Sequence, residues 1–282
     1  MKYLYLIIVL VCISAQNVCK KAYGKKVGDG GIYIFSTLNS VAALLFFLVT
    51  AGKLDFNMSV LPYAAGFAAS YGIGTVASIA AISHGPLSLT ALIVSYSLMM
   101  PTVYGLAFLQ DPVSIGLIPG LILLVISLVL INKKSDDAPI TLKWVFYVIL
   151  SFLGNGMCSI VQKMQQVSFD GSYKNEFMIM ALALVIVFTL IMAVITERKD
   201  SKKYVGAGLG FGVLCGAANG IVNLFVMILS NLMPASLMFP LISAGGIIIT
   251  YIISKFFYKE TLSRPQLIGF LLGTASVILL NV

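Results

Sequence analysis

The stretch FYKETLSRPQLIGFLLGTASVILLN, residues Phe257 to Asn281, has a counterpart earlier in the chain. The counterpart is FLQDPVSIGLIPGLILLVISLVLIN, residues Phe108 to Asn132. Each stretch has an acid near its start (Glu260 or Asp111), then a long apolar run and a final Asn. The identical pairs are Phe108/Phe257, Ser114/Ser263, Gly120/Gly269, Leu123/Leu272, Ser127/Ser276, Leu130/Leu279 and Asn132/Asn281. A segment that occurs twice indicates that a larger unit is duplicated in this chain.

Further pairs extend the duplication toward the N-terminus. Pro86–Leu89 (PLSL) corresponds to Pro234–Leu237 (PASL), and Lys20 corresponds to Lys163. Each copy also has a ladder of small residues spaced by four. The ladders are Gly66, Ser70, Gly74 and Ser78 in the first copy and Gly208, Gly212, Gly216 and Gly220 in the second. Small residues let helix backbones approach closely in lipid, so we expect packing positions here, which can also be hinges or leave room for a substrate.

The composition excludes an ordinary soluble domain. The 282 residues are 60% apolar and only 10% charged, with a mean hydropathy of +1.03, whereas a soluble domain has about a quarter charged residues. A helix needs roughly 20 mostly apolar residues to span a bilayer. Ten such runs can be placed, near residues 3–20, 31–51, 61–83, 86–107, 113–131, 144–165, 176–196, 205–230, 235–257 and 264–281. Because the runs are continuously apolar and do not alternate, they predict helices.

The ten runs and the duplication together predict an all-α polytopic membrane protein. Its ten transmembrane helices form two five-helix repeats, residues 1–137 and 138–282. Because five is odd, the second repeat enters the membrane from the opposite side, so the two repeats are inverted. Inverted repeats are typical of secondary transporters, which hold their substrate near the midplane where the repeats meet.

The same pattern resembles the EamA branch of the drug/metabolite transporter superfamily. The resemblance covers the whole chain and is strongest from about Met233 to Asn281, where YKETLSRPQLIGFLLGTASVILLN is similar to that branch's ending. The first repeat departs from it, because Asp111-Pro112 replaces a glutamate-containing step. The resemblance implies a metabolite or drug carrier with a central cavity lined by spans one, three, four, six, eight and nine.

Lys and Arg residues are distributed unequally between the two sides of the predicted bundle. Fourteen of the eighteen lie after spans one, three, five, seven and nine. The positive-inside rule then places these loops in the cytoplasm and both termini outside, whereas the resemblance implies both termini inside. The rule also explains the net charge of +8 without a nucleic acid partner. Residues 1–16 could pass for a secretory signal, but we expect a first span, because removing it would break the repeat.

Polar groups at mid-bilayer depth are costly and are therefore candidates for contacting a solute. Asn219 and Asn223 lie one helical turn apart beside the second glycine ladder. Amides both donate and accept hydrogen bonds, which suits a polar metabolite, although bonding between helices is an equally open interpretation. The other candidate substrate-binding residues are Asn155, Ser159, Gln162, Gln16, Asn17, Tyr71, Tyr96, Ser95 and Ser243.

Two lysines, one histidine and two prolines have alternative roles. Long stems favour an interpretation in which Lys20 and Lys163 extend to the membrane interface, whereas an inward-pointing Lys163 would favour an anionic substrate. His84, the single histidine, is expected to cap a tight turn rather than act as a protonation gate. Pro101 and Pro240 interrupt helical hydrogen bonding and are candidate hinges.

These observations predict a secondary transporter that moves a small polar metabolite or drug-like solute by alternating access. All ten acids fall in loops or at span ends, which favours a facilitator or exchanger over a deep proton relay. We expect no enzymatic activity, no cofactor and no metal, because no catalytic or metal-ligand spacing is present. The expected partners are the solute and the lipid of the cell membrane, with the chain a monomer or homodimer. A flippase for a lipid-linked substrate and a non-transporting scaffold are the alternatives.

Overall fold

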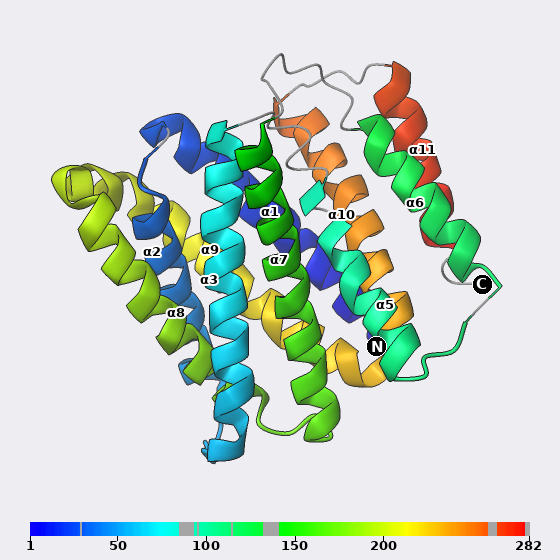
Figure 1. Ribbon diagram of the computed structural model, residues 1–282, viewed down its shortest axis with the longest axis horizontal. Coiled ribbons are helices and arrows are strands. Elements are labelled where there is room, and N and C mark those ends of the chain that lie inside the picture. Colours follow the sequence, from blue (N-terminus) through cyan, green and yellow to red (C-terminus); the bar gives the residue numbers. More distant parts are fainter. Residues whose placement is uncertain are drawn as a thin grey trace. The chain divides into compact units, whose positions relative to one another are not determined.

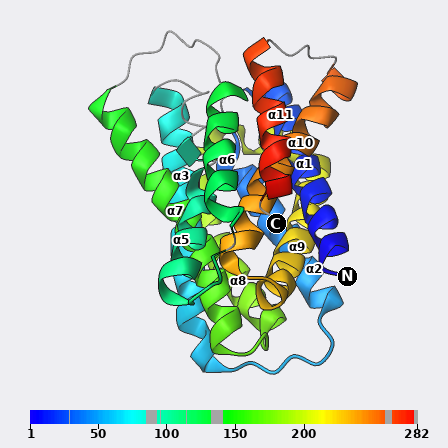
Figure 2. The same cartoon turned by 90° about the vertical axis from the view of Figure 1, so that its right-hand side faces the viewer.

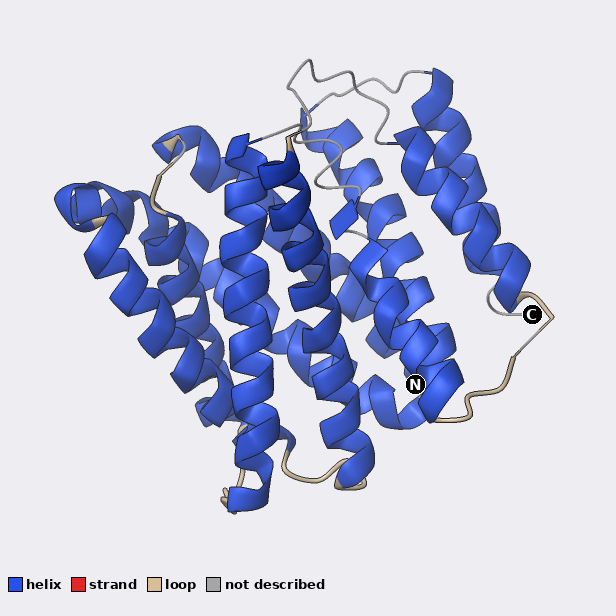
Figure 3. Ribbon diagram, viewed as in Figure 1, coloured by secondary structure: helices blue, strands red, loops and turns tan. Residues whose placement is uncertain are grey.

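The structure is a computed structural model that describes residues 1–28, 30–84, 93–94, 96–113, 115–131, 141–258 and 264–279. These described residues form helices and connecting loops and contain no strand (Figure 3). The long helices in chain order are α1 (Lys2–Val27), α2 (Ile32–Thr50), α3 (Leu61–His84), α5 (Met99–Phe108), α6 (Leu117–Ile131), α7 (Leu142–Ser168), α8 (Lys174–Thr196), α9 (Ser201–Leu232), α10 (Ala235–Tyr258) and α11 (Arg264–Leu279). The single-turn helices are η1 (Met58–Val60), η2 (Tyr96–Leu98) and η3 (Arg198–Asp200).

Each of the ten predicted apolar runs overlaps one of the long helices. Run four, predicted at 86–107, is described at residues 93–94 and 96–107 and overlaps η2 and α5. Five helical stretches are long and apolar enough to cross a membrane by length and composition: Ile32–Thr50, Met58–Ser78, Leu142–Ser168, Lys174–Thr196 and Arg198–Leu232. Shorter apolar stretches lie in α1, α6, α10 and α11. Helices of this kind are compatible with a protein that passes through a membrane several times.

The two candidate hinge prolines occupy different helical environments. Pro101 lies in the first turn of α5. Backbone N–H groups in the first turn have no acceptor within the helix, so the missing N–H of proline costs no intrahelical hydrogen bond there. Pro240 lies inside α10, which continues past it. Pro240 therefore keeps its predicted position within a helix, whereas the break predicted at Pro101 coincides with the start of a helix.

The chain divides into two compact units, and each unit takes helices from both halves of the sequence. Unit 1 comprises Met1–Gly72 and Met164–Asn231. Unit 2 comprises Ile73–Lys163 and Leu232–Val282. The expected boundary between the sequence repeats, at 137/138, falls outside the described residues.

In unit 1, α2 and α8 pack side by side and run antiparallel (Figure 1). Glu197, just after α8, accepts hydrogen bonds from the backbone N–H groups of Tyr33 and Ile34 in the first turn of α2, at 3.0 and 2.9 Å. Glu176, in the first turn of α8, accepts from the N–H of Asp55 beyond the other end of α2, at 3.0 Å. A carboxylate at a helix N-terminus satisfies otherwise unpaired N–H groups and complements the helix dipole. The two glutamates therefore fix the register of this helix pair at both ends.

In unit 2, α6 and α11 pack side by side through two reciprocal hydrogen bonds (Figures 1 and 2). The Ser127 hydroxyl on α6 donates to the Gly269 carbonyl on α11 at 2.6 Å. The Ser276 hydroxyl on α11 donates to the Gly120 carbonyl on α6 at 2.8 Å. Both serines are fully buried. The two serines match each other in the quoted stretches, and so do the two glycines. Each helix therefore donates to its partner the same kind of hydrogen bond that it accepts from that partner.

We expect Ser127→Ala and Ser276→Ala to destabilise the protein by similar amounts, about 1 kcal/mol each, because each removes one buried hydrogen bond. The measurement is the midpoint of unfolding of the purified protein in detergent. Ser201→Ala, at the start of α9, is the control and is expected to change the midpoint little. A strongly unequal effect of the two substitutions would contradict the equivalence of the two contacts.

The glycine ladder of α9 faces α2 within unit 1. A Cβ added at Gly212 would lie 2.8 Å from the Cβ of Leu38, and one at Gly216 would overlap the carbonyl oxygen of Asn39. A Cβ at Gly220 would lie 2.5 Å from the ring of Phe46. Only a residue without a side chain permits such a close approach of the two helices.

Candidate functional site

Asn219 and Asn223 on α9 form a hydrogen-bonded amide pair in unit 1. The Asn223 amide nitrogen donates to the backbone and side-chain oxygens of Asn219, at 2.9 and 3.0 Å. Both side chains are half-buried. Gly220, between them in sequence, contacts Phe46 of α2. The predicted arrangement, two amides one turn apart beside the ladder, is therefore present.

The polar residues of α7 in unit 2 lie where α3 crosses closely. The Ser151 hydroxyl donates to the Gly74 carbonyl of α3 at 3.2 Å. The Asn155 amide donates to the Ser151 carbonyl at 2.9 Å. A Cβ at Gly74 would lie 3.1 Å from the Asn155 backbone nitrogen. Farther along α7, Ser159 is half-buried and Gln162 is buried. Gly74 therefore permits α3 and α7 to cross closely, and the Asn155 amide donates within its own helix.

Lys163, for which a side chain extended to the membrane interface was the favoured expectation, is buried. Its side chain is only 5% exposed, and its ammonium donates to the Met233 carbonyl at 3.3 Å. Asp111 is close enough to attract the Lys163 charge. The Asp111 carboxylate in turn accepts from the backbone N–H of Ser236, in the first turn of α10, at 2.8 Å. A buried cation requires such acceptors, so Lys163 binds the segment between α9 and α10, and Asp111 binds the first turn of α10.

The remaining predicted residues are placed as follows. Lys20 is exposed and Gln16 is buried. The Tyr96 hydroxyl donates to the Val125 carbonyl at 3.2 Å, and the Tyr71 ring stacks on Phe67. Gly208 is buried beside Tyr23, and Gly66, whose carbonyl accepts from Ser70, and Ser243 are half-buried. The side chains of Asn17 and His84, and Ser95 as a whole, lie outside the described parts of the chain.

Sequence analysis missed a buried amide network at the C-terminal end of α7. Gln165 and Gln166 are fully buried and hydrogen-bonded to each other. The Asn231 amide, at the end of α9, donates to Gln166 at 2.9 Å, and the Gln165 amide donates to the Ser172 carbonyl at 3.0 Å. The signal was available, because two successive glutamines follow Lys163 in an apolar run. Since all these bonds join segments of unit 1, the network fixes the turn between α7 and α8.

A second missed group lies at the opposite end of unit 1, where α1 ends and α2 begins. The buried Tyr23 hydroxyl donates to the Gly31 carbonyl at 2.9 Å, and its ring stacks on Phe35 at 4.6 Å between centroids. Burial, followed by the nearby Glu197 and Tyr204, raises the pKa of Tyr23 to about 12. The phenol therefore stays protonated and acts as a hydrogen-bond donor.

Comparison with known proteins supports the fold without naming an activity. No family model and no curated protein match the chain. One solved structure, described as "Crystal structure of protein", is similar with a TM-score of 0.76 at 10% identity, covering 99% of this chain and 95% of that one. Structures of the sodium-calcium exchanger NCX_Mj match at 16% and 17% identity, covering 99% of this chain and 97% and 94% of theirs, with a TM-score of 0.21. A TM-score of 0.21 is too low to support any argument. The first structure, with a TM-score of 0.76, shows a similar fold alone.

The chain is therefore an all-helical protein with several helices that have the length and apolar composition of membrane spans. Its described polar residues form hydrogen-bonded pairs and small networks inside each unit. Within the described residues, no group of three or more His, Cys, Asp or Glu side chains could hold a metal ion.

Proposed function

We propose that this protein is a secondary transporter of a small polar solute, built from two inverted five-helix repeats that provide alternating access. The observation that carries the proposal is the reciprocal pair of hydrogen bonds between α6 and α11. Residues that match in sequence make matching contacts in both directions, as a local twofold axis between the two helices requires. In the proposed repeat, such an axis would relate α6 of the first half to its counterpart α11 in the second.

The other paired helices support the same relation. The predicted repeat makes α2 equivalent to α8 and α5 equivalent to α10, and the members of each pair pack against each other. The glutamate contacts at both ends show that α2 and α8 run in opposite directions. Equivalent spans that run antiparallel are what an odd number of helices per repeat requires. Transporters built this way bind their substrate near the midplane between repeats.

The chemistry of the candidate residues favours a polar solute of modest size. The half-buried amides of α9 and α7 can donate to and accept from hydroxyl, amide or carboxylate groups. We also propose membership of the EamA branch, on the strength of the C-terminal stretch and the paired Pro-x-Ser-Leu segments, and a location in the cell membrane. The proposal assigns no enzymatic activity to the chain.

A membrane-topology experiment tests the inverted repeat. Single cysteines introduced at Lys53, after α2, and at Lys199, after α8, in a cysteine-free background would be labelled with an impermeant maleimide in intact cells and in inverted vesicles. Inversion predicts that one of the two positions is labelled only in intact cells and the other only in inverted vesicles. Labelling of both positions from the same side would contradict the proposal.

A transport experiment tests the activity itself. A thermal-shift screen of purified protein against metabolite pools would identify a stabilising solute, and uptake of that labelled solute would then be measured in proteoliposomes. Saturable counterflow, absent from protein-free liposomes, is the expected result. Solute binding without counterflow would favour a sensor or scaffold instead.

We expect Asn223→Ala to lower the rate of this uptake by at least about tenfold while leaving the melting temperature nearly unchanged. The substitution removes a half-buried amide that donates to Asn219, one turn earlier on the same helix, and the loss of one such bond costs little stability. Asn57→Ala, in the loop before α3, is the control. Unchanged uptake rate and apparent affinity would remove Asn223 from the site.

A further inference from the structure

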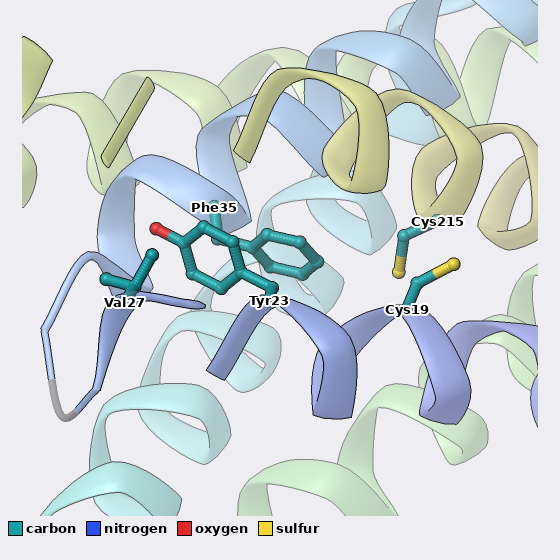
Figure 4. Packing of buried hydrophobic residues seen from close by; sticks show 5 residues of the cluster. All are labelled: Cys19, Tyr23, Val27, Phe35 and Cys215. Carbon is teal, nitrogen blue, oxygen red and sulfur yellow. The ribbon is translucent and has the colours of Figure 1, made fainter. Parts of the chain in front are cut away.

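Two of the four cysteines come together from distant parts of the chain within unit 1. Cys19 on α1 is 5% exposed and Cys215 on α9 is fully buried, and both belong to one cluster with Tyr23, Val27 and Phe35. Figure 4 shows both sulfur atoms in the space where α1 faces α9. The two thiols are close enough to influence each other electrostatically. Neither is part of a disulfide.

We propose that Cys19 and Cys215 form a two-sulfur site for one soft, thiol-seeking metal ion, which joins α1 to α9. Soft thiolate ligands select soft ions such as Cu(I), and ions of this class accept two sulfur ligands in a linear arrangement. An ion that requires four ligands fits poorly, because no third His, Cys, Asp or Glu completes a metal-binding group among the described residues.

The metal-binding step balances with the two thiols alone. Each thiol loses its proton to solvent as its sulfur–metal bond forms, so one ion releases two protons and no electron is transferred. With Cu(I) the product carries one negative charge, and with Hg(II) it is neutral.

The packing around the pair makes the expected linkage rigid. Tyr23, one turn after Cys19, is anchored through its hydroxyl to Gly31 and through its ring to Phe35. Gly216, next to Cys215, allows close contact with α2. Both sulfur-bearing helices are therefore held by neighbours on either side. A preorganised pair gains affinity because ordering the ligands costs little on binding.

The experiment uses Hg(II) as probe with reduced, purified full-length protein in detergent. The variant that lacks the other two cysteines, Cys12→Ser/Cys158→Ser, is expected to bind one Hg(II) per chain with two sulfur ligands by X-ray absorption, and to melt at a higher temperature with Hg(II) than without it. Adding Cys19→Ser is expected to weaken binding by roughly 100-fold or more, the gain typical of a second tethered ligand. Adding Cys215→Ser in its place is expected to do the same.

Folding is checked separately, because both cysteines are buried. Without metal, each serine variant should elute and melt like its parent. If the Cys19→Ser variant does not, Cys19→Ala, which avoids a buried hydroxyl, replaces it. Coordination by a single sulfur, or failure of the Cys12→Ser/Cys158→Ser protein to react before it unfolds, would overturn the proposal. So would retention of affinity after loss of Cys19.

Discussion

Gly216→Leu is expected to prevent assembly of the folded protein. A Cβ at this position overlaps the carbonyl oxygen of Asn39 and lies 2.5 Å from the Cβ of Ala42. The obstacle is the α2 backbone, which cannot turn aside as a flexible side chain can. Overpacking a core costs typically 1–3 kcal/mol when neighbours can adjust, so we expect a loss of more than about 3 kcal/mol here.

A matched control lies on the same helix. Gly210 is exposed, and a Cβ there has no neighbour within 4 Å, so Gly210→Leu should express and melt almost like the parent. Gly212→Leu should be intermediate, because the added Cβ would lie 2.8 Å from the Cβ of Leu38, a milder overlap than the one at Gly216. The measurements are the monodisperse fraction after detergent extraction and the melting temperature. A Gly216→Leu protein that equals Gly210→Leu in both would show that α9 and α2 are not in backbone contact.

Lys163→Met is the second change with a large expected effect. Methionine keeps much of the length of the stem but removes the donor to Met233 and the charge that faces Asp111. Removing one member of a buried charged pair leaves the other without compensation. Because Asp111 is half-buried rather than fully buried, we expect an intermediate loss of about 2 kcal/mol of unfolding free energy.

A double-mutant cycle separates the charge from the hydrogen bond. Asp111→Asn removes the negative charge but keeps an oxygen that can accept from Ser236. If the charges interact, the double substitution should cost less than the sum of the single ones, by about 1 kcal/mol. Asp170→Asn, on an exposed loop at positive φ, is the control and should lie within about 0.5 kcal/mol of the parent. Additive effects in the cycle would mean that Lys163 acts only through Met233.

The helices themselves could be predicted from the sequence, because the signals that form them are local. An apolar run bounded by polar residues requires a helix in lipid, where every backbone group must be paired internally. Residues 174–196, which form α8, were expected at 176–196, and residues 32–50, which form α2, at 31–51. The ladder in α9 was identified from its spacing alone, since a period of four places Gly212 and Gly216 on one face of a helix.

The partners of those helices could not be predicted, because they depend on contacts between residues far apart in the chain. The ladder does not reveal that Gly216 meets Asn39 of α2, nor do four scattered cysteines reveal that Cys19 and Cys215 share one cluster. The serines of the quoted stretches matched in the sequence, but only the structure shows that each bonds to the glycine of the other stretch.

Lys20 and Lys163 show most directly which features the sequence predicts and which depend on the tertiary structure. The sequence predicted matching positions for them in a repeat, with both side chains extended to the membrane interface. The tertiary structure places Lys20 in the open and buries Lys163, whose acceptor at Met233 lies 70 residues farther along the chain. A charge can be buried only where acceptors converge on it, and that convergence is a property of packed helices rather than of any single segment.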